Sequence, residues 1–529
     1  MRRLKTFISF ILMLSLMLSI FIVSLPINAV VADASESENS VWDGKSKNTV
    51  QPNGDTYTIT SPGELAWFRD VVQNGSVDFS DYVIEITGNF DLNNMSWNPI
   101  NVKNKYLHCK KLYVHDCTFK NLTRNLFSDL KIDECYFINT DFIDLNMNDV
   151  NGTLGAIAGD LEISDKGRLY IYDVSINGKI WGSENTFWGN YRGNYGALMR
   201  GLKVDSDANI DITYVRVDLK SRGLDTVGGL IAQITKGGTG GIIHIEKSSV
   251  HGDFFARDNY GYSSVFCGGM IGEVSGNDLV IEECVVDGSF KAEGYTSWSG
   301  GMIAKAAADT LIIKNCQFNV SLSSHSPGGI LGHSTMEDNG KSIIQNCFVV
   351  GNFSRYGQAF VTLNEKDNGI PVENCYFDYQ KSNLSKDAMY GNGRLTVFWE
   401  VTSYTKKLKN CKGLTSVEAK IPSNFANWDF NNVWKLGDSS PVLIWNNIGI
   451  DPPQWSDRLL ETDSESDKEI VELVKRYTTA ANVDAWDKIM QSSNSDEEKF
   501  RQLSELSSNM GLNNPAEGIK YLQDTSSER

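Results

Sequence analysis

The segment GGMIGEVSGNDLVIEECVVDGSF, residues 268–290, contains the unit from which the architecture of this 529-residue chain follows. It opens with two glycines and two apolar residues. It continues through a short apolar stretch at 279–281 and reaches a polar residue followed by Cys284. Short runs rich in Val, Ile and Phe, interrupted by Gly, Asn and Asp, predict β-strands separated by turns.

The same unit recurs along the chain. Its glycine pair stands at 228–229, 268–269, 300–301 and 328–329, and weaker single-glycine starts occur at Gly155 and Gly196. In the copy that begins at residue 228, Ser249 stands where the cysteine is expected. The pairs of a polar residue and a cysteine are Asp116-Cys117, Glu134-Cys135, Glu283-Cys284, Asn315-Cys316, Asn346-Cys347, Asn374-Cys375 and Asn410-Cys411.

Units that recur every few tens of residues are typical of solenoids and propellers. The variable spacing favours a solenoid, because each turn contacts only its neighbours and its loops can lengthen outward. We therefore predict an all-β fold, a right-handed parallel β-helix. Cysteines at one inward position would stack about 4.8 Å apart. Most of the nine cysteines are expected to be reduced and buried, since a ladder of bridges would need correct S–S geometry at every step.

Both ends of the solenoid are expected to carry caps, because end turns expose apolar surface and unpaired strand edges. Ser61, Pro62 and Glu64 predict a helix that runs to about Gln73, with Ser61 and Glu64 forming a capping box. At the other end, an aromatic closing segment is predicted from Trp428, Phe430, Trp434 and Trp445.

The chain divides into five segments. Residues 1–34 have a basic start, an apolar run and a small-residue site at 32–34, which predict a signal peptide; an uncleaved membrane anchor is the alternative. An N-terminal lead-in and cap (35–100), the β-helix (101–447) and a Pro-containing linker (448–455) follow. Residues 456–529 predict a small α-helical tail, which is either a marginal appendage or a module that docks a partner.

The composition excludes some classes of partner. The formal net charge is −17, so the chain would repel the phosphates of nucleic acids and offers no basic patch to anionic membranes. After removal of the signal peptide we expect no stable membrane insertion. The predicted location is extracellular, either secreted or associated with the cell surface.

The repeats resemble those of GLUG-motif proteins of bacterial surfaces. The best matching stretches are 268–290 and 328–353, each of which ends in a Gly-x-Phe turn. The lead-in at 42–100 and the exit at 428–445 are also similar, although the Gly-rich segment usual after the lead-in is replaced by short turns that carry cysteine. The resemblance implies a surface-exposed, adhesin-like protein without an assigned reaction.

An enzyme on this scaffold needs clustered catalytic groups, which the sequence does not reveal. Asp218, Asp253 and Asp287 could line one face, but solvated turn residues are the favoured interpretation. The six histidines, His244 among them, stand isolated and lack zinc-ligand spacing. We assign no catalytic residue, metal or cofactor, and the interpretation leans away from an enzyme.

Aromatic residues gather just before several of the glycine starts. If these segments project from one edge of successive turns, their rings could stack on sugars while Arg192 and nearby polar groups supply hydrogen bonds. The alternative is that the rings fold back onto their own loops. The predicted ligand-binding residues are Trp181, Trp188, Tyr191, Arg192, Tyr195, Tyr260, Tyr262, Tyr295 and Trp298.

Three functions remain open at this point. The favoured one is a binding or adhesive protein that recognises a glycan or an extracellular protein through the flank of the β-helix. The second is a carbohydrate-active enzyme, a polysaccharide lyase or a glycoside hydrolase, on the same scaffold. The third is a passive stalk whose helical tail makes the interactions.

Overall fold

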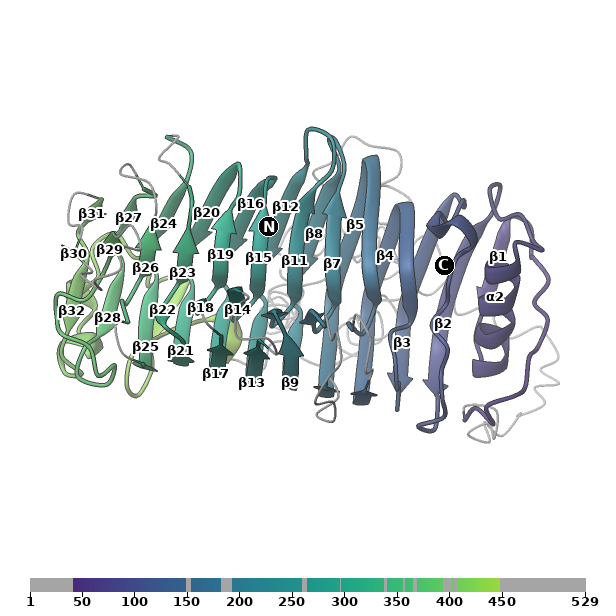
Figure 1. Cartoon of the computed structure of the whole chain (residues 1–529), viewed down its shortest axis with the longest axis horizontal. Coiled ribbons are helices and arrows are strands. Elements are labelled where there is room, and N and C mark those ends of the chain that lie inside the picture. Colours follow the sequence, from purple (N-terminus) through teal and green to yellow (C-terminus); the bar gives the residue numbers. More distant parts are fainter. Residues whose placement is uncertain are drawn as a thin grey trace, which may run out of the picture. The chain divides into compact units, whose positions relative to one another are not determined.

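The computed structural model describes residues 41–148, 154–181, 193–258, 264–294, 296–336, 340–354, 357–364, 369–392, 402–403 and 407–447. The predicted signal peptide, linker and helical tail lie outside these ranges. Within the described residues, 25 strands form one large sheet and five short strands form a second. The pairings between successive turns are parallel, which confirms the predicted parallel β-helix (Figure 1).

Each turn of the central part, which we call a rung, contributes strands at three positions named A, B and C, and a fourth strand to the small sheet. The A strands are β7 (Met199–Val204), β11 (Ile231–Lys236), β15 (Ile271–Ser275), β19 (Ile303–Ala307), β23 (Leu331–Ser334) and β26 (Val361–Asn364). The B strands are β8 (Asn209–Thr213), β12 (Ile242–Glu246), β16 (Asp278–Glu282), β20 (Thr310–Lys314), β24 (Ile343–Gln345), β27 (Val372–Glu373) and β31 (Leu408–Lys409). The C strands are β9 (Arg216–Leu224), β13 (Ser249–Arg257), β17 (Val285–Glu293), β21 (Gln317–Ser323), β25 (Phe348–Phe353), β28 (Tyr376–Asp378) and β32 (Lys412–Leu414). The small sheet consists of β6 (Tyr195–Gly196), β10 (Thr226–Gly228), β14 (Ser264–Gly268), β18 (Thr296–Gly300) and β22 (Ser326–Gly328).

The N-terminal rungs use longer, continuous strands. They comprise β1 (Thr56–Ile59), β2 (Val83–Asp91), β3 (Lys111–Lys120), β4 (Phe127–Asn148) and β5 (Ala158–Trp181), with a 3₁₀ turn at Lys103–Lys105. β1 pairs with β2 and β2 with β3 in parallel, so the stack already begins within the predicted lead-in segment. β5 then pairs with β7, β8 and β9, and thus connects these long strands to the repeated rungs.

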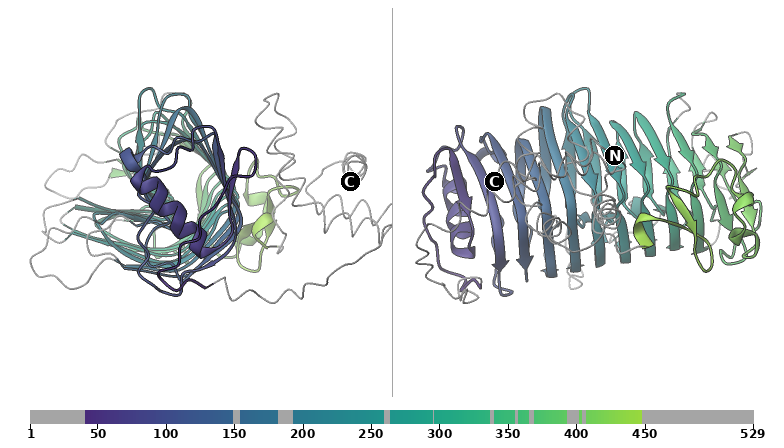
Figure 2. Two further views of the ribbon diagram at one scale, coloured as in Figure 1. Left: turned by 90° about the vertical axis from the view of Figure 1, so that its right-hand side faces the viewer. Right: turned by 180° about the vertical axis from the view of Figure 1, so that it is seen from behind.

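The predicted N-terminal cap is present as helix α2 (Pro62–Asn74). Ser61 and Glu64 form the capping box, in which the Glu64 amide donates to Ser61 Oγ over 3.4 Å and the Ser61 amide donates to Glu64 Oε2 over 3.1 Å. The apolar face of α2, with Leu65, Phe68 and Val72, is buried in the main core. Figure 2 shows α2 lying across this end of the stack.

The paired glycines form two adjacent columns at the bend between the small sheet and the A strands. The amide of Gly269 donates to the carbonyl of Gly300 over 2.9 Å, and the amide of Gly301 donates to that of Gly328 over 3.0 Å. A Cβ on Gly269 would lie 1.8 Å from the carbonyl oxygen of Gly301. Since the backbones of neighbouring rungs meet here, only glycine fits. Gly196 pairs with Gly228, which places the weaker starts in the same column.

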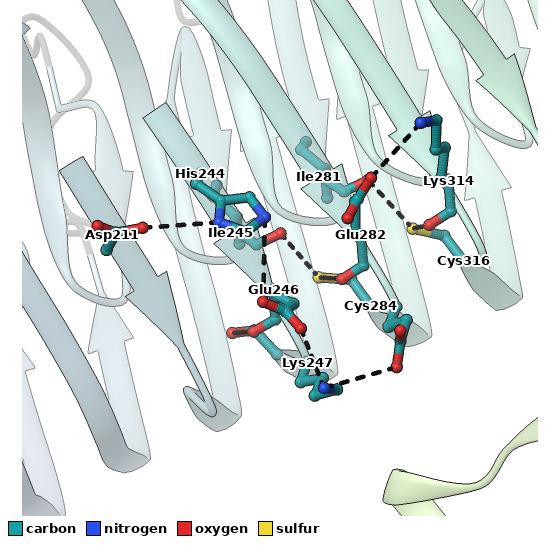
Figure 3. A network of polar contacts seen from close by, with 12 residues as sticks. Asp211, His244, Ile245, Glu246, Lys247, Ile281, Glu282, Cys284, Lys314 and Cys316 are labelled. Carbon is teal, nitrogen blue, oxygen red and sulfur yellow. Dashed lines mark hydrogen bonds and ion pairs between the residues drawn. The ribbon is translucent and has the colours of Figure 1, made fainter. Parts of the chain in front are cut away.

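The bend between B and C strands explains the pairs of a polar residue and a cysteine. The polar residue takes a left-handed conformation, with φ of 50° at Glu283 and 52° at Asn315, and Asn and Asp suit this conformation best. The next side chain points inward, and its thiol donates to the carbonyl two residues earlier, over 3.2 Å for Cys284 and 3.1 Å for Cys316 (Figure 3). The column therefore requires a small side chain, preferably with a donor.

Two residues that the sequence analysis assigned to this column do not stand in it, because the register of the strands differs from the one predicted. Ser249 pairs with Val285, so Ser248 stands level with Cys284, and its hydroxyl donates to the carbonyl of Glu246 over 2.9 Å. Cys135 pairs with Leu112 on a B-position segment, and Thr140 takes the corner position beside Cys117. Ser and Thr can replace Cys in this column because each donates to the same type of carbonyl.

All nine cysteines are free, and seven of them are buried. We expect nine thiols to react with a disulfide reagent in denaturant, and only Cys411 to react rapidly in the native protein. Cys411 is partly exposed, and a hydrogen bond with Cys375 lowers the pKa of its thiol. Desolvation raises the pKa of Cys109, the other partly exposed cysteine, to about 12. Mass spectrometry after timed labelling checks this; fewer than nine reactive thiols in denaturant contradicts it.

The sequence analysis placed the aromatic closing segment at the C-terminal end of the stack, and this prediction is wrong. Residues 418–447, here called the flank segment, run back along the outer side of the rungs (Figure 2, yellow-green). Trp428 and Trp434 pack with the outward side chains of the C strands, among them Val285, Phe348 and Tyr376. These outward side chains are apolar, so the segment buries a flank that would otherwise face water.

The remaining short elements lie near this end of the described chain. β33 (Trp434–Leu436) and β34 (Pro441–Leu443) form an antiparallel pair within the flank segment, and β29 (Gly391–Asn392) pairs antiparallel with β30 (Thr402–Ser403). The 3₁₀ turns of the flank segment are Glu418–Lys420, Pro422–Asn424 and Trp445–Asn447.

Candidate functional site

Polar side chains follow the outer surface of the A strands, which we call the A face. Because consecutive A strands pair in register, equivalent residues stand above one another. The position five residues after each glycine start points outward. From the N-terminal rungs onward this column contains Asp129, Asp160, Gly201, Gln233, Glu273, Lys305 and His333.

A cavity of about 290 Å³ opens on the N-terminal half of the A face, at the lower end of the roughly 300–1,000 Å³ usual for ligand pockets. Its floor is backbone, since the leucines between the polar residues point into the core. We call this cavity the charged pocket. Its polar lining consists of Lys105, Asp129, Lys131, Asp160, Glu162, Arg200, Lys203, Gln233 and Thr235.

The charges of the pocket are held in pairs. Lys131 Nζ lies 2.6 Å and Lys203 Nζ 3.1 Å from Oε1 of Glu162, and the guanidinium of Arg200 contacts the carboxylate of Asp160. Gly201 leaves room for that carboxylate, because a Cβ there would clash with it. On consecutive rungs, Lys131, Glu162 and Lys203 thus present a donor, an acceptor and a donor in fixed positions.

The protonation states follow from these contacts. Desolvation alone would raise the pKa of Glu162, but the hydrogen bonds from Lys131 and Lys203 outweigh it and lower that pKa. The hydrogen bond to Glu162 raises the pKa of Lys131, while desolvation lowers that of Arg200. Glu162 is therefore a carboxylate and Lys131 an ammonium group at neutral pH. The pocket thus offers fixed charges and hydrogen-bonding groups.

Beyond the pocket, aromatic side chains of the small sheet face the A strands. Trp298 stacks on Phe266 with ring centroids 5.3 Å apart and on His333 at 5.0 Å. Lys305 Nζ lies 5.2 Å from the ring of Phe266. Gln233 Nε2 donates to Glu273 Oε2 over 3.3 Å, which links the pocket to this aromatic end of the A face.

Three of the aromatic residues predicted from the sequence fall within the described ranges. Tyr195 is 2% exposed and belongs to the main core, and Trp298 is 7% exposed. Trp181 ends β5 on the C side, where the guanidinium carbon of Arg222 lies 4.6 Å from its ring. The described part of the chain thus shows no single stripe formed by these three. Outside it lie Trp188, Tyr191, Arg192, Tyr260, Tyr262 and Tyr295, and the ligand-binding role of the whole set stays a prediction.

The three predicted acidic residues lie on C strands rather than in turns. Asp218 and Asp287 share one outward column with His251 between them, and His251 Nδ1 lies 3.4 Å from Asp287 Oδ2. Asp253 stands two residues farther along β13, opposite Lys220.

The sequence analysis missed the A-face residues, because their column varies from Asp to Gly, Gln, Lys and His. Their constant offset from the glycine starts is the signal that could have revealed them.

Histidines that stand isolated in the sequence gain partners from neighbouring rungs. Figure 3 shows His244 between Asp211 and Glu246, with Nδ1 3.6 Å from Asp211 Oδ1 and Nε2 4.0 Å from Glu246 Oε2. Lys247 continues this network, with Nζ 3.0 Å from Glu246 Oε1. The network lies on the outer face of the B strands and binds adjacent rungs to one another.

His115 has the strongest such environment. It is 2% exposed, with Nε2 3.0 Å from Glu85 Oε1 and Nδ1 3.1 Å from Asp116 Oδ2. Desolvation lowers its pKa, but the hydrogen bonds to Asp116 and Glu85 outweigh this and raise it to about 9. His115 is thus an imidazolium between two carboxylates at neutral pH.

We expect this site to make stability depend on pH. A group whose pKa rises from 6.5 on folding stabilises the protein fully below pH 6.5 and stops doing so as the pH passes about 9. Between about pH 6 and pH 10, the free energy of unfolding of wild type should fall by on the order of 1–3 kcal/mol more than that of His115→Gln, as measured by denaturant unfolding. Parallel pH curves for the two proteins would contradict the assignment.

Among the described residues, no cluster of three or more His, Cys, Asp or Glu side chains is arranged to hold a metal ion. In the same part of the chain, no helix combines the length and apolar character that a membrane span requires.

No protein-family model matches the chain, and no curated protein matches it either. The resemblance to GLUG-motif proteins therefore stays a prediction. A parallel β-helix can support binding proteins and enzymes alike, so the fold does not assign a function.

Proposed function

We propose that this is a secreted or cell-surface binding protein that holds a glycan chain on its A face. The observation that carries the proposal is the charged pocket, where Glu162 is fixed between Lys131 and Lys203 in consecutive rungs. Sugar hydroxyls both donate and accept hydrogen bonds, and paired carboxylates and ammonium groups satisfy both needs.

The geometry of the A face suits an extended ligand. Outward groups repeat at the rung spacing of about 4.8 Å, so a chain lying along the stack meets a new donor or acceptor at each rung. The polar column continues from Gln233 to Glu273 and reaches Trp298 and His333. The charged pocket and the polar column beyond it supply hydrogen-bonding partners for successive sugars.

One observation favours a second candidate, the cleavage of an acidic glycan. Lys131, Arg200 and Lys203 gather in the charged pocket, where their positive charges could neutralise a uronate. In such an elimination a base removes the proton next to the carboxylate, a double bond forms, and the glycosidic C–O bond breaks while the leaving oxygen takes up a proton. Because these cations are already paired with Glu162 and Asp160, binding remains the favoured function.

A glycan array probed with the full chain tests the proposal, with release of unsaturated products or reducing ends assayed in parallel. We expect binding without turnover, and a loss of about tenfold in affinity for Lys203→Gln, as for removal of one charge-assisted hydrogen bond. The matched control is Lys314→Gln, because Lys314 also pairs with a glutamate on the outer surface, Glu282, but on a B strand.

The outcomes separate the candidates. Weaker binding of Lys203→Gln with unchanged binding of Lys314→Gln supports the A face. Equal effects of both substitutions would contradict it, and turnover would replace the binding function by the lyase. Absence of binding to every glycan on the array would favour a protein ligand or the passive stalk.

A further inference from the structure

A ladder of tyrosines lies on the outer surface of the N-terminal rungs at the B position. Tyr113 stacks on Tyr136 with ring centroids 4.7 Å apart, and Tyr136 stacks on Tyr170 at 5.3 Å. Ile138 and Tyr172 pack beside them. We call these five residues the tyrosine patch. It lies on the outside of the B strands, apart from the A face.

The patch is deeply buried for side chains that point outward. Tyr136 is 0% and Ile138 is 9% exposed. In the column of Ile138, Thr213 is 4% and Glu246 is 7% exposed, so buried outward positions continue into the later rungs that the flank segment approaches. The patch thus belongs to a buried band on the outer surface of the B strands.

The flank segment leads toward this patch. The indole N–H of Trp428 donates to the carbonyl of Asn374 over 2.9 Å, and that of Trp445 donates to the carbonyl of Glu283 over 2.6 Å. Asn374 and Glu283 are the polar residues at the bend between the B and C strands of two different rungs. The segment therefore moves from later to earlier rungs as it proceeds. Its aromatic residues follow one flank of the β-helix.

The described part of the flank segment ends beside the patch. The ring of Trp445 lies 6.1 Å from that of Tyr214, which in turn lies 5.6 Å from Tyr172. From the rung of Tyr214 to that of Tyr113 the distance is roughly 14 Å at the rung spacing. The eight residues 448–455 can span about 26 Å when extended, so they can cross the whole patch.

We infer that residues 448–455 dock on the tyrosine patch and continue the flank segment across the N-terminal rungs. These residues include Ile448, Ile450, Pro452, Pro453 and Trp455, an apolar set that matches the row of ring edges. A sugar is a poor occupant, because the faces on which it would stack are already taken by neighbouring tyrosines. The tail after residue 455 then starts from a fixed point on the β-helix.

Chemical nitration of tyrosines in the full chain tests this inference. We expect Tyr113, Tyr136 and Tyr170 to react slowly in wild type, with the partly exposed Tyr379 as internal reference. The double substitution Ile450→Asp and Trp455→Asp should raise their rates by about tenfold or more, because exposure follows the population of the undocked state. The matched control is Val417→Asp, a substitution of the same kind at a side chain that is 72% exposed.

Peptide mass spectrometry gives the nitration rate of each tyrosine, and circular dichroism checks that the β-helix persists in each variant. Unchanged protection of the patch in the folded double variant would overturn the inference. So would protection that grows with protein concentration, because a second copy would then be the cover. A photo-crosslinker in place of Ile138 should capture a peptide from 448–455, and capture of any other peptide would also overturn the inference. Because the patch is separate from the A face, either proposal can fail while the other stands.

Discussion

Gly269→Val is expected to disrupt the β-helix at its centre. The valine Cβ would lie 1.8 Å from the carbonyl oxygen of Gly301, and both partners are backbone atoms that cannot move without breaking the pairing of adjacent rungs. Overpacking of this kind costs roughly 3 kcal/mol or more. In a solenoid the loss is felt first by neighbouring rungs. Hydrogen exchange should therefore accelerate in β14, β15, β18 and β19 before it does so near α2.

A glycine with open space around it provides the control. Gly340 has a φ of 73°, and nothing lies within 4 Å of a Cβ built there. Asn tolerates this left-handed conformation, so Gly340→Asn should change stability by less than about 1 kcal/mol. Native-like exchange in folded Gly269→Val would contradict the close backbone contact that the glycine column implies.

Trp434→Ala is expected to release the flank segment while leaving the rungs intact. Trp434 is 0% exposed and stacks on Trp428 with ring centroids 4.2 Å apart. Truncating a buried tryptophan costs roughly 3–5 kcal/mol. The flank segment packs on the outside of the C strands, so its loss does not remove any rung pairing. Limited proteolysis should cut between residues 418 and 447 much faster than in wild type.

Leu436→Ala is the matched control, because Leu436 lies on the same strand, β33, but is 40% exposed. Its proteolysis should follow that of wild type. If Trp434→Ala were as resistant as Leu436→Ala, or if it unfolded the rungs as well, the flank packing described above would be wrong.

The sequence predicted the features that depend on local geometry. The glycine pairs at 228–229, 268–269, 300–301 and 328–329 occupy the bend where two rung backbones meet and a Cβ would clash. Helix α2 followed from Ser61, Pro62 and Glu64, whose roles as N-cap, first-turn proline and capping-box partner are set within four residues. Such signals need no knowledge of the rest of the fold.

Features that depend on register between distant residues were less predictable. A shift of one residue moved the corner position from Ser248 to Ser249, and Cys135 was placed in the wrong column because a pair of a polar residue and a cysteine also fits a strand interior. The flank segment was assigned to the end of the stack, because aromatic content reports burial but not location. Its partner Glu283 lies 162 residues from Trp445.

The candidate site was missed for a related reason. Its residues share an offset from the glycine starts, but they share no chemical type, as Asp160, Gln233 and Lys305 illustrate. Sequence motifs are recognised by residue type, whereas this column is defined by direction alone. The ion pairs of Glu162 with Lys131 and Lys203 join residues more than 30 positions apart and appear only once the register is known.

The most direct test of glycan binding on the A face is a structure of the full chain bound to the glycan that gives the strongest array signal. We predict ligand density along β5, β7 and β11, with sugar hydroxyls in contact with Glu162 and Lys203. Density confined to the C strands, or to the chain beyond residue 447, would contradict the assignment of the A face as the binding site.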